Sequence, residues 1–136
     1  MTIFVDASAI VAMIAKEPEA GAFAEFLNND PLRITPPLAV WEAVRGVQSA
    51  RAVPLTEARG LVFDFIAAAE LQIVAVEPAD ADLALDAHAR FGKGVNRAAL
   101  NFGDCFTYAV ARRHEAALLF KGDDFTQTDI RDATLI

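Results

Sequence analysis

The sequence predicts an α/β fold, in which a central, mostly parallel sheet of four or five strands is flanked by helices. Short apolar runs alternate along the chain with longer stretches that have helical spacing. The first run, residues 2–5, is apolar or β-branched throughout, as expected of a parallel strand covered on both faces. The length of 136 residues fits one compact domain, so we expect residues 1–136 to form a single unit.

The N-terminal part contains the first strand and two helices. Ser8 is expected to cap a helix that begins near Ala9 and runs to Ala15. Pro18 suits the first turn of a second helix. The apolar stripe of that helix consists of Ala22, Phe23, Phe26 and Leu27. The polar run 28–31 is expected to form a turn.

The middle of the chain predicts two strands that enclose two helices. Residues 32–35 form the second strand, and the prolines at 36–37 open a helix that runs to about Ala50. The expected core stripe of this helix consists of Leu38, Trp41, Val44 and Val47. Thr56 is expected to cap the next helix. Its apolar residues are Leu61, Val62, Phe65 and Ile66, and the third strand then covers residues 71–76.

The C-terminal part predicts two helices and one or two strands. Pro78 ends the third strand, and a helix follows over residues 79–91. After a glycine-containing loop, a second helix covers residues 102–114. Residues 117–120 form the fourth strand, and residues 133–136 are expected to form a short last strand.

Composition and charge narrow the classes of function. The net charge of −7 disfavours non-specific nucleic-acid binding, which needs basic surface, so a nucleic-acid enzyme of this charge requires metal ions or a local basic patch. It also suits a basic protein partner. The single cysteine, Cys105, cannot form an internal disulfide, which favours a reducing cytoplasm. No membrane partner is expected, because no apolar run approaches about 20 residues and the N-terminus does not resemble a signal peptide.

Acidic residues occur where strands end or helices start, and these are candidate metal ligands. The candidates are Asp6, Glu42, Asp104, Asp123 and Asp124. In an open α/β sheet the carboxyl ends of parallel strands share one edge, so we expect these side chains to converge there. Clustered carboxylates repel one another and require a cation. Oxygen ligands of this kind select Mg²⁺ or Mn²⁺.

Each acidic residue also has a purely structural explanation. Asp6 could satisfy backbone N–H groups at a helix start, and Glu42 could pair with Arg45 on the helix surface. Asp104 could complement a helix dipole in a first turn capped by Asn101, and the aspartates at 123–124 suit a turn. For each acid taken alone, the structural explanation is as good as the metal site. The common location of the acids favours the metal site.

Other motifs carry less chemistry. The run Gly92-Lys93-Gly94 lacks the spacing of a phosphate-binding loop. His88 and His114 are isolated and lack the spacing of zinc ligands. Cys105 is expected to be a small core residue.

With these segments identified, the chain resembles the PIN-domain ribonucleases, specifically the VapC-type toxins of bacterial toxin–antitoxin pairs. The segments that match are residues 5–9, Trp41-Glu42, residues 100–106, residues 119–125 and Thr128-Asp129. The resemblance implies a three-layer PIN-like fold and a Mg²⁺-dependent endoribonuclease. It also implies a homodimer that is silenced by a cognate VapB-type antitoxin.

Residue by residue, Asp6, Glu42 and Asp104 look like three of the family's acidic ligands. Asp124, just before Phe125, is similar to the commoner position of the fourth, and Asp123 could contribute. Ser8 looks like the small hydroxyl residue that accompanies the first aspartate.

The expected mechanism is hydrolysis of an RNA phosphodiester, with one or two metal ions that activate water and neutralise charge. Basic residues near the acids are candidates to hold the RNA backbone, or are ordinary solvated surface: Arg45, Lys93, Arg97 and Lys121.

Two other classes remain open. A receiver-like signalling domain would share the acids at strand ends and a late lysine, but it needs an aspartate after a middle strand, where this chain has Glu77-Pro78. A binding module that has lost catalysis would keep the fold, although the intact acidic set argues against it.

Overall fold

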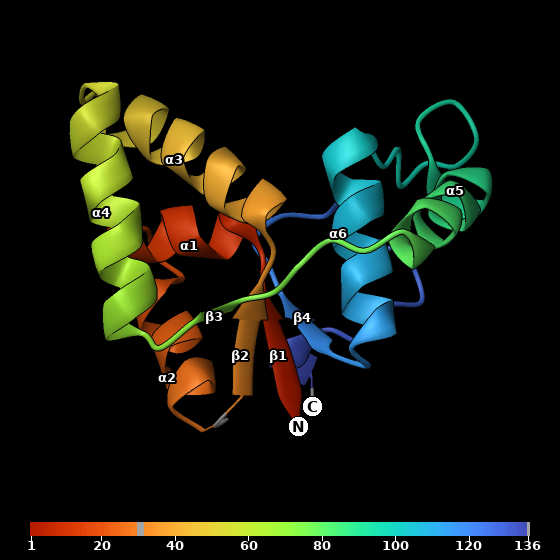
Figure 1. Cartoon of the computed structure of the whole chain (residues 1–136), viewed down its shortest axis with the longest axis horizontal. Helices are drawn as coiled ribbons and strands as arrows, with labels where there is room; N and C mark the ends of the chain where they lie inside the picture. Colours follow the sequence, from red (N-terminus) through yellow and green to blue (C-terminus); the bar gives the residue numbers. More distant parts are fainter. Residues whose placement is uncertain (30–31, 136) are drawn as a thin grey trace.

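The computed structural model describes residues 1–29 and 32–135. Within these residues the strands form one parallel sheet in the order β3-β2-β1-β4 (Figure 1). The strands are β1 (Thr2–Val5), β2 (Leu32–Thr35), β3 (Gln72–Ile73) and β4 (Ala117–Leu119). This sheet confirms the predicted α/β class with a parallel centre.

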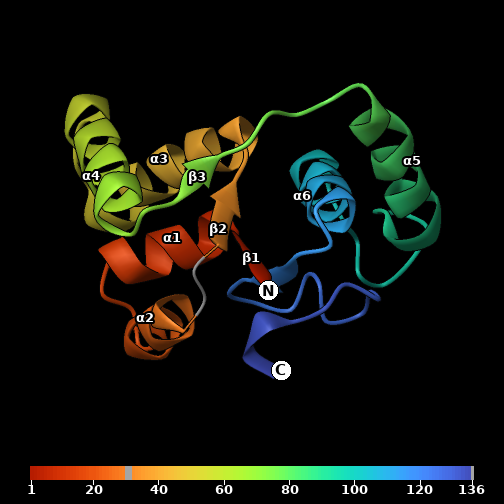
Figure 2. The same cartoon turned by 60° about the horizontal axis from the view of Figure 1, so that its bottom comes forward.

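Helices cover the sheet on both faces and give the three layers that the sequence led us to expect. They are α1 (Ala7–Ile14), α2 (Ala20–Asn28), α3 (Pro37–Arg51), α4 (Leu55–Ala68), α5 (Ala79–Phe91) and α6 (Phe102–Arg113). Helices α1 to α4 lie on one side of the sheet, and α5 and α6 lie on the other (Figures 1 and 2).

The alternation of side chains along β1 explains why the core has two halves. Ile3 and Val5 belong to the apolar cluster of α1, α3 and α4. Phe4, between them, belongs to the cluster of α5 and α6. Successive side chains of a strand point to opposite faces, so one buried strand anchors both layers of helices.

The end of β1 lies beside the end of β4 and fixes the edge where function is expected. Val5 pairs with Leu119, and the Asp6 amide donates to the Leu119 carbonyl oxygen at 3.0 Å. The hydroxyl of Thr35, a buried residue at the end of β2, donates to the Val5 carbonyl oxygen at 3.0 Å. Asp6 and the turn after β4 therefore leave the sheet at the same edge.

Three predicted helix starts are wrong by one or more residues. Asp6 caps α1, which begins at Ala7, so Ser8 lies inside the first turn. Helix α2 begins at Ala20, and Pro18 belongs to the preceding turn. Helix α4 begins at Leu55 after Pro54, whose extended backbone sets the entry, so Thr56 does not cap it.

The predicted third strand is much shorter than residues 71–76. Only Gln72 and Ile73, both exposed, pair with β2, and β3 is one of the two edge strands of the sheet. The Val74 amide still donates to the Thr35 carbonyl oxygen, and beyond Val74 the chain crosses toward α5 (Figure 2). An edge strand with one neighbour has little to hold a longer ladder together.

The predicted last strand is instead a short 3₁₀ helix, Ala133–Leu135. The Asp132 carboxylate accepts hydrogen bonds from the Thr134 amide and hydroxyl at 2.8 and 2.7 Å, and this local turn competes with extended backbone. Ile136, and residues 30 and 31 of the predicted turn, lie outside the described residues.

The core stripe of α3 differs from the predicted one at Trp41. That side chain is 65% exposed, while Ala39, Val40 and Ala43 are buried together with Val44 and Val47. A spacing of three drifts around a helix of 3.6 residues per turn, and small residues let α3 lie close to its neighbours.

Candidate active site

Asp6 both caps α1 and faces α6. Its Oδ2 accepts hydrogen bonds from the Ser8 amide at 3.1 Å and the Ser8 hydroxyl at 2.6 Å. Its Oδ1 accepts from the Thr107 hydroxyl of α6 at 3.4 Å. The Ser8 hydroxyl oxygen in turn accepts from the Lys121 amide at 2.9 Å. The structural role considered for Asp6 is therefore present, and its carboxylate also lies at the junction of three segments.

Glu42 projects from α3 toward the start of α6. A Cβ atom placed on Gly103 would lie 2.6 Å from the Glu42 Oε1 atom, so the carboxylate packs directly against the Gly103 backbone. The proposed surface partner, Arg45, instead has its guanidinium 5.9 Å from the centre of the Trp41 ring. Glu42 thus approaches the helix that carries Asp104.

Asp104 forms a capping box with Asn101 at the start of α6. The Asn101 side-chain oxygen accepts from the Asp104 amide at 2.9 Å, and Asp104 Oδ2 accepts from the Asn101 amide at 3.2 Å. The predicted cap is confirmed. It fixes the rotamer of Asp104 through one carboxylate oxygen.

The pKa shifts of Glu42 and Asp104 indicate that neighbouring acids act on these two carboxyl groups. Burial raises the pKa of Asp6, although hydrogen bonds from Ser8 and Thr107 act in the opposite direction. Burial, followed by the charges of Asp6 and Asp104, raises the pKa of Glu42 to about 7. Burial raises the pKa of Asp104 to about 6; the Asn101 amide opposes this, and the charges of Asp124 and Asp6 add to it.

The causes of these pKa shifts indicate that Asp6, Glu42, Asp104 and Asp124 share one electrostatic environment. Asp124 is exposed and follows β4, and its charge acts on Asp104. Asp123 is also exposed. Its charge is not among the causes that shift the pKa values of Asp6, Glu42 or Asp104.

The donor set suits a hard divalent cation. All four side chains offer carboxylate oxygens, and their mutual repulsion is the condition that a cation relieves. In residues 1–29 and 32–135, no three acidic, histidine or cysteine side chains are already gathered closely enough to hold a metal ion. Binding would therefore draw in the flexible ends of Glu42 and the exposed Asp124.

The basic candidates have varied surroundings. Lys121 Nζ forms ion pairs with Glu17 at 3.2 Å and Glu19 at 3.1 Å, which tie the turn after β4 to the α1–α2 connection. Lys93 and Arg97 are exposed on the loop between α5 and α6. Lys121 is thus engaged by acids of its own chain.

Sequence reasoning did not identify Thr107 or Gly103. Thr107 is a buried polar residue one turn after Asp104, and this spacing on a helix was the available signal. Gly103 next to Asp104 could be noticed in the sequence, but its contact with Glu42 depends on how α3 and α6 meet.

The comparisons with known proteins agree with this arrangement. The family model described as the PIN domain matches residues 3–131. The chain belongs to the PIN-domain family. Within it, ribonuclease VapC30 of Mycobacterium tuberculosis is 36% identical over 131 residues, which cover 96% of this chain and 98% of that one. A VapC ribonuclease of Rhizobium meliloti is 38% identical over 139 residues, covering 93% and 98%.

A solved structure supports the fold of this PIN domain. The crystal structure of VapC20 from Mycobacterium tuberculosis, described as a toxin that cleaves the sarcin–ricin loop, superposes with a TM-score of 0.73. It is 16% identical and covers 94% of this chain and 95% of that one. VapC ribonucleases are in general metal-dependent. Among the described residues of this PIN domain, no helix has the length and apolar character needed to cross a membrane.

Proposed function

We propose that this PIN domain, residues 1–136, is a Mg²⁺-dependent endoribonuclease and the toxin of a toxin–antitoxin pair. Its near full-length similarity to VapC ribonucleases makes it an RNA-cleaving hydrolase by family. The proposal concerns the residues and the ion that carry out the cleavage.

The observation that supports the proposal is the electrostatic action of neighbouring acids on Glu42 and Asp104, which come from distant parts of the chain. Asp6 and Asp104 raise the pKa of Glu42, and Asp124 and Asp6 raise that of Asp104. Grouped acids with raised pKa values are typical of functional sites. We assign Asp6, Glu42, Asp104 and Asp124 as ligands, with Asp124 preferred to Asp123.

Each residue has a role that follows from its contacts. Asp6 is held by Ser8 and Thr107, and Asp104 by its cap, so these two form the rigid part of the site. Glu42 and Asp124 would complete the ligand set. A bound Mg²⁺ would supply charge neutralisation at the phosphate and a more acidic water molecule. Mn²⁺ has the same preference for oxygen ligands and is expected to substitute.

The test is cleavage of RNA by the purified protein with and without Mg²⁺. Asp6→Asn and Asp104→Asn should abolish Mg²⁺-dependent cleavage, whereas Asp86→Asn, an exposed acid on α5, should cut like the wild type. Cutting at the wild-type rate by both site variants would refute the assignment. Sequencing the ends of cleaved cellular RNA would then identify the target.

A groove between α3 and α4 suits the apolar part of a VapB-type antitoxin. This hollow of about 790 Å³ is lined by Trp41, Val44, Leu55, Phe63, Ile73 and neighbouring residues. Trp41 also lines a smaller hollow of about 340 Å³ beside Glu42 and Gly103. A segment lying in the groove could therefore extend a basic side chain past Trp41 to the acidic site, as the net charge of −7 favours.

A separate apolar face suits the proposed homodimer. Leu85 and Phe102 are 65% and 74% exposed, and with Phe106 they border a hollow of about 630 Å³ between α5 and α6. Large exposed apolar residues next to each other mark association surfaces.

Two variants separate these surfaces. Leu85→Asp should yield monomers in light scattering while it still binds the antitoxin, the product of the adjacent gene. Phe63→Asp should remain a dimer but should lose binding to the antitoxin. Loss of both interactions in either variant would contradict the assignment of two faces.

We infer that the pair acts in the cytoplasm, where its RNA substrate and the reduced Cys105 would be found.

A further inference from the structure

The segment after β4 carries Asp124 but has little regular structure of its own. Residues 121–131 consist of turns and bends. Local hydrogen bonds shape its turns: the Thr126 amide and hydroxyl donate to the Asp123 carbonyl oxygen, and the Thr128 amide and hydroxyl donate to the Phe125 carbonyl oxygen. The position of Asp124 therefore depends on contacts between this segment and the rest of the molecule.

Contacts at both ends attach the segment to the sheet. At its start, the Lys121 amide donates to the Ser8 hydroxyl, and the buried Phe125 ring lies edge-on to Phe120 with centroids 5.4 Å apart. At its end, the Leu118 amide donates to the Arg131 carbonyl oxygen at 2.8 Å. Apart from the apolar cluster that Phe125 shares with Tyr108, neither set of contacts provides a polar connection to α6, the helix that carries Asp104.

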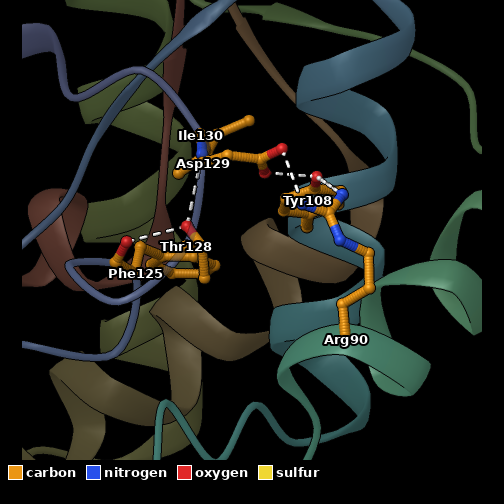
Figure 3. Close-up of polar contacts among 6 residues, drawn as sticks. All are labelled: Arg90, Tyr108, Phe125, Thr128, Asp129 and Ile130. Atoms are coloured by element: carbon orange, nitrogen blue, oxygen red, sulfur yellow. Dashed lines mark hydrogen bonds and ion pairs between the residues drawn. The ribbon is translucent and has the colours of Figure 1, made fainter. Parts of the chain in front are cut away.

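A cluster of three polar side chains makes that connection (Figure 3). The hydroxyl of Tyr108, on α6, donates to Asp129 Oδ1 at 2.5 Å. Arg90, on α5, donates to Asp129 Oδ2 at 3.0 Å and to the Tyr108 hydroxyl oxygen at 3.3 Å. The Tyr108 ring is buried against Phe91, with centroids 5.8 Å apart, so its hydroxyl is held in place.

The cluster is in register with the candidate site. Tyr108 follows Asp104 by one turn of α6, so the two side chains lie on the same face of the helix. Asp129 is separated from Asp124 only by the two hydrogen-bonded turns around Phe125. A single hydrogen bond between Tyr108 and Asp129 thus links the helix that carries one acid to the segment that carries the other.

Such a link is needed because Asp104 and Asp124 repel each other. The charge of Asp124 acts on Asp104 in the metal-free protein. Repulsion would push an irregular segment with an exposed aspartate away from α6. The attraction of Asp129 to Arg90 and Tyr108 offsets it, and hydrogen bonds that involve a charged group are stronger than neutral ones.

We propose that Tyr108, Asp129 and Arg90 form a latch that positions Asp124 opposite Asp104. The three are positioning residues and act through Asp124, so the proposal rests on the proposed function of the two aspartates. A latch that only stabilised the C-terminal segment would change unfolding but neither metal binding nor turnover by the folded protein.

The experiment compares Tyr108→Phe and Asp129→Asn with the matched control Asp132→Asn. Tyr108→Phe removes only the hydroxyl and keeps the ring packing. Asp132→Asn makes the same change of charge three residues after Asp129, where the carboxylate only bonds Thr134. All proteins are assayed well below their unfolding temperatures for kcat and KM on RNA. Mn²⁺ binding is measured by calorimetry without RNA, and hydrogen exchange is measured at the Thr126 and Thr128 amides.

We expect both latch variants to lose roughly 10- to 100-fold in kcat, as is common when a site residue is displaced by about 1 Å, with KM nearly unchanged. Mn²⁺ should bind several-fold more weakly, and the two amides should exchange faster. The double variant should be no worse than Asp129→Asn alone, because that change already weakens the contacts of Asp129 with both Tyr108 and Arg90. Asp132→Asn should match the wild type in every measurement.

Wild-type kcat and Mn²⁺ affinity in Tyr108→Phe and Asp129→Asn would overturn the latch, even if exchange were faster. The proposed function would still stand in that case, provided that Asp6→Asn and Asp104→Asn are inactive. If those two site variants cut RNA normally, the proposed function fails and the latch fails with it.

Discussion

Glu42 and Gly103 are in direct contact across the α3–α6 boundary, and the contact leaves no room for a side chain on Gly103. A Cβ atom there would lie 2.6 Å from Glu42 Oε1 and 3.2 Å from its Cδ. Both distances are shorter than ordinary van der Waals contacts. The missing side chain thus allows the carboxylate to reach the start of the helix that carries Asp104.

Gly103→Ala should therefore reduce RNA cleavage without destabilising the fold. The added methyl group meets only the flexible end of Glu42, which can move aside, and alanine is a better helix former than glycine by about 1 kcal/mol. We expect a loss of roughly 10- to 100-fold in activity with an unchanged or higher unfolding temperature. Gly60→Ala, in α4, is the matched control, because a Cβ there meets nothing within 4 Å.

A second substitution tests whether the loss acts through Glu42. Glu42→Asp shortens the side chain by one methylene group and removes the clash with Ala at position 103. The double variant should be no less active than Glu42→Asp alone. Fully additive losses would contradict the steric explanation.

The raised pKa of Glu42 predicts that the metal-free protein becomes less stable as the pH rises. Its carboxyl has a pKa of about 7 in the folded protein against an ordinary value of 4.5, so the folded state binds more protons between these pH values. Stability falls with pH where the folded state holds more protons than the unfolded state. Glu42→Gln should weaken this dependence between about pH 4.5 and 7, and the raised pKa values of Asp104 and Asp6 account for the part that remains.

The expected gain from Glu42→Gln at pH 7.5 is about 1 kcal/mol. The full shift would correspond to roughly 3 kcal/mol, but Glu42 is only half-buried and solvent screens its charge. Urea unfolding at several pH values in a chelating buffer measures the effect. A variant that is less stable than the wild type at pH 7.5 would disprove the prediction.

The sequence predicted the fold class and the structural positions of Asp6 and Asp104 better than the exact bounds of the elements. Asp6 and Asp104 could be placed because strand ends and capping residues are local signals, and the cap by Asn101 was expected. Trp41 was placed in the core because its spacing suits a helix face, yet which face is buried depends on the packing of α3 against α1 and α4. Strand β3 ended early because its ladder depends on a single neighbour.

The contacts that organise the candidate site were not predictable from local patterns. Tyr108 and Asp129 are 21 residues apart, and Arg90 and Asp129 are 39 apart. Nothing in the intervening sequence sets their separation in space; the packing of α5 on α6 does. The sequence likewise left Asp123 and Asp124 as alternatives, because adjacent residues of a turn differ only in direction.

The choice between Asp123 and Asp124 as the fourth ligand can be tested with a pair of matched variants. Asp124→Asn should lower Mg²⁺-dependent cleavage by at least roughly 100-fold, since even supporting residues of metal sites cost 10- to 100-fold. Asp123→Asn should remain within a few-fold of the wild type, because the Asp123 contacts in the structure are made by its backbone carbonyl. The reverse order of effects, measured in one RNA cleavage assay, would reassign the fourth ligand.

The ion pair between Asp80 and Arg113 should be the most sensitive point of the α5–α6 layer. Asp80 has no exposed surface and accepts hydrogen bonds from Arg113 Nε at 2.7 Å and Nη2 at 3.0 Å, and from the Glu77 amide at 2.8 Å. Burial acts to raise the pKa of Asp80, but the Arg113 hydrogen bonds and the Glu77 amide outweigh it and lower that pKa. Asp80 therefore joins the start of α5 to the end of α6.

Asp80→Ala should lower the free energy of unfolding by about 3–5 kcal/mol, because it leaves the mostly buried Arg113 guanidinium with the exposed Glu77, at 3.4 Å, as its remaining charged partner. The control Asp82→Ala, an exposed acid on the same helix, should change it by less than about 0.5 kcal/mol. Since the folded pKa is lowered, the stabilisation by Asp80 is present above the ordinary pKa of 3.8 and is lost as the pH falls through the folded pKa. Equal urea midpoints for the two variants at pH 7 would show that the ion pair contributes little.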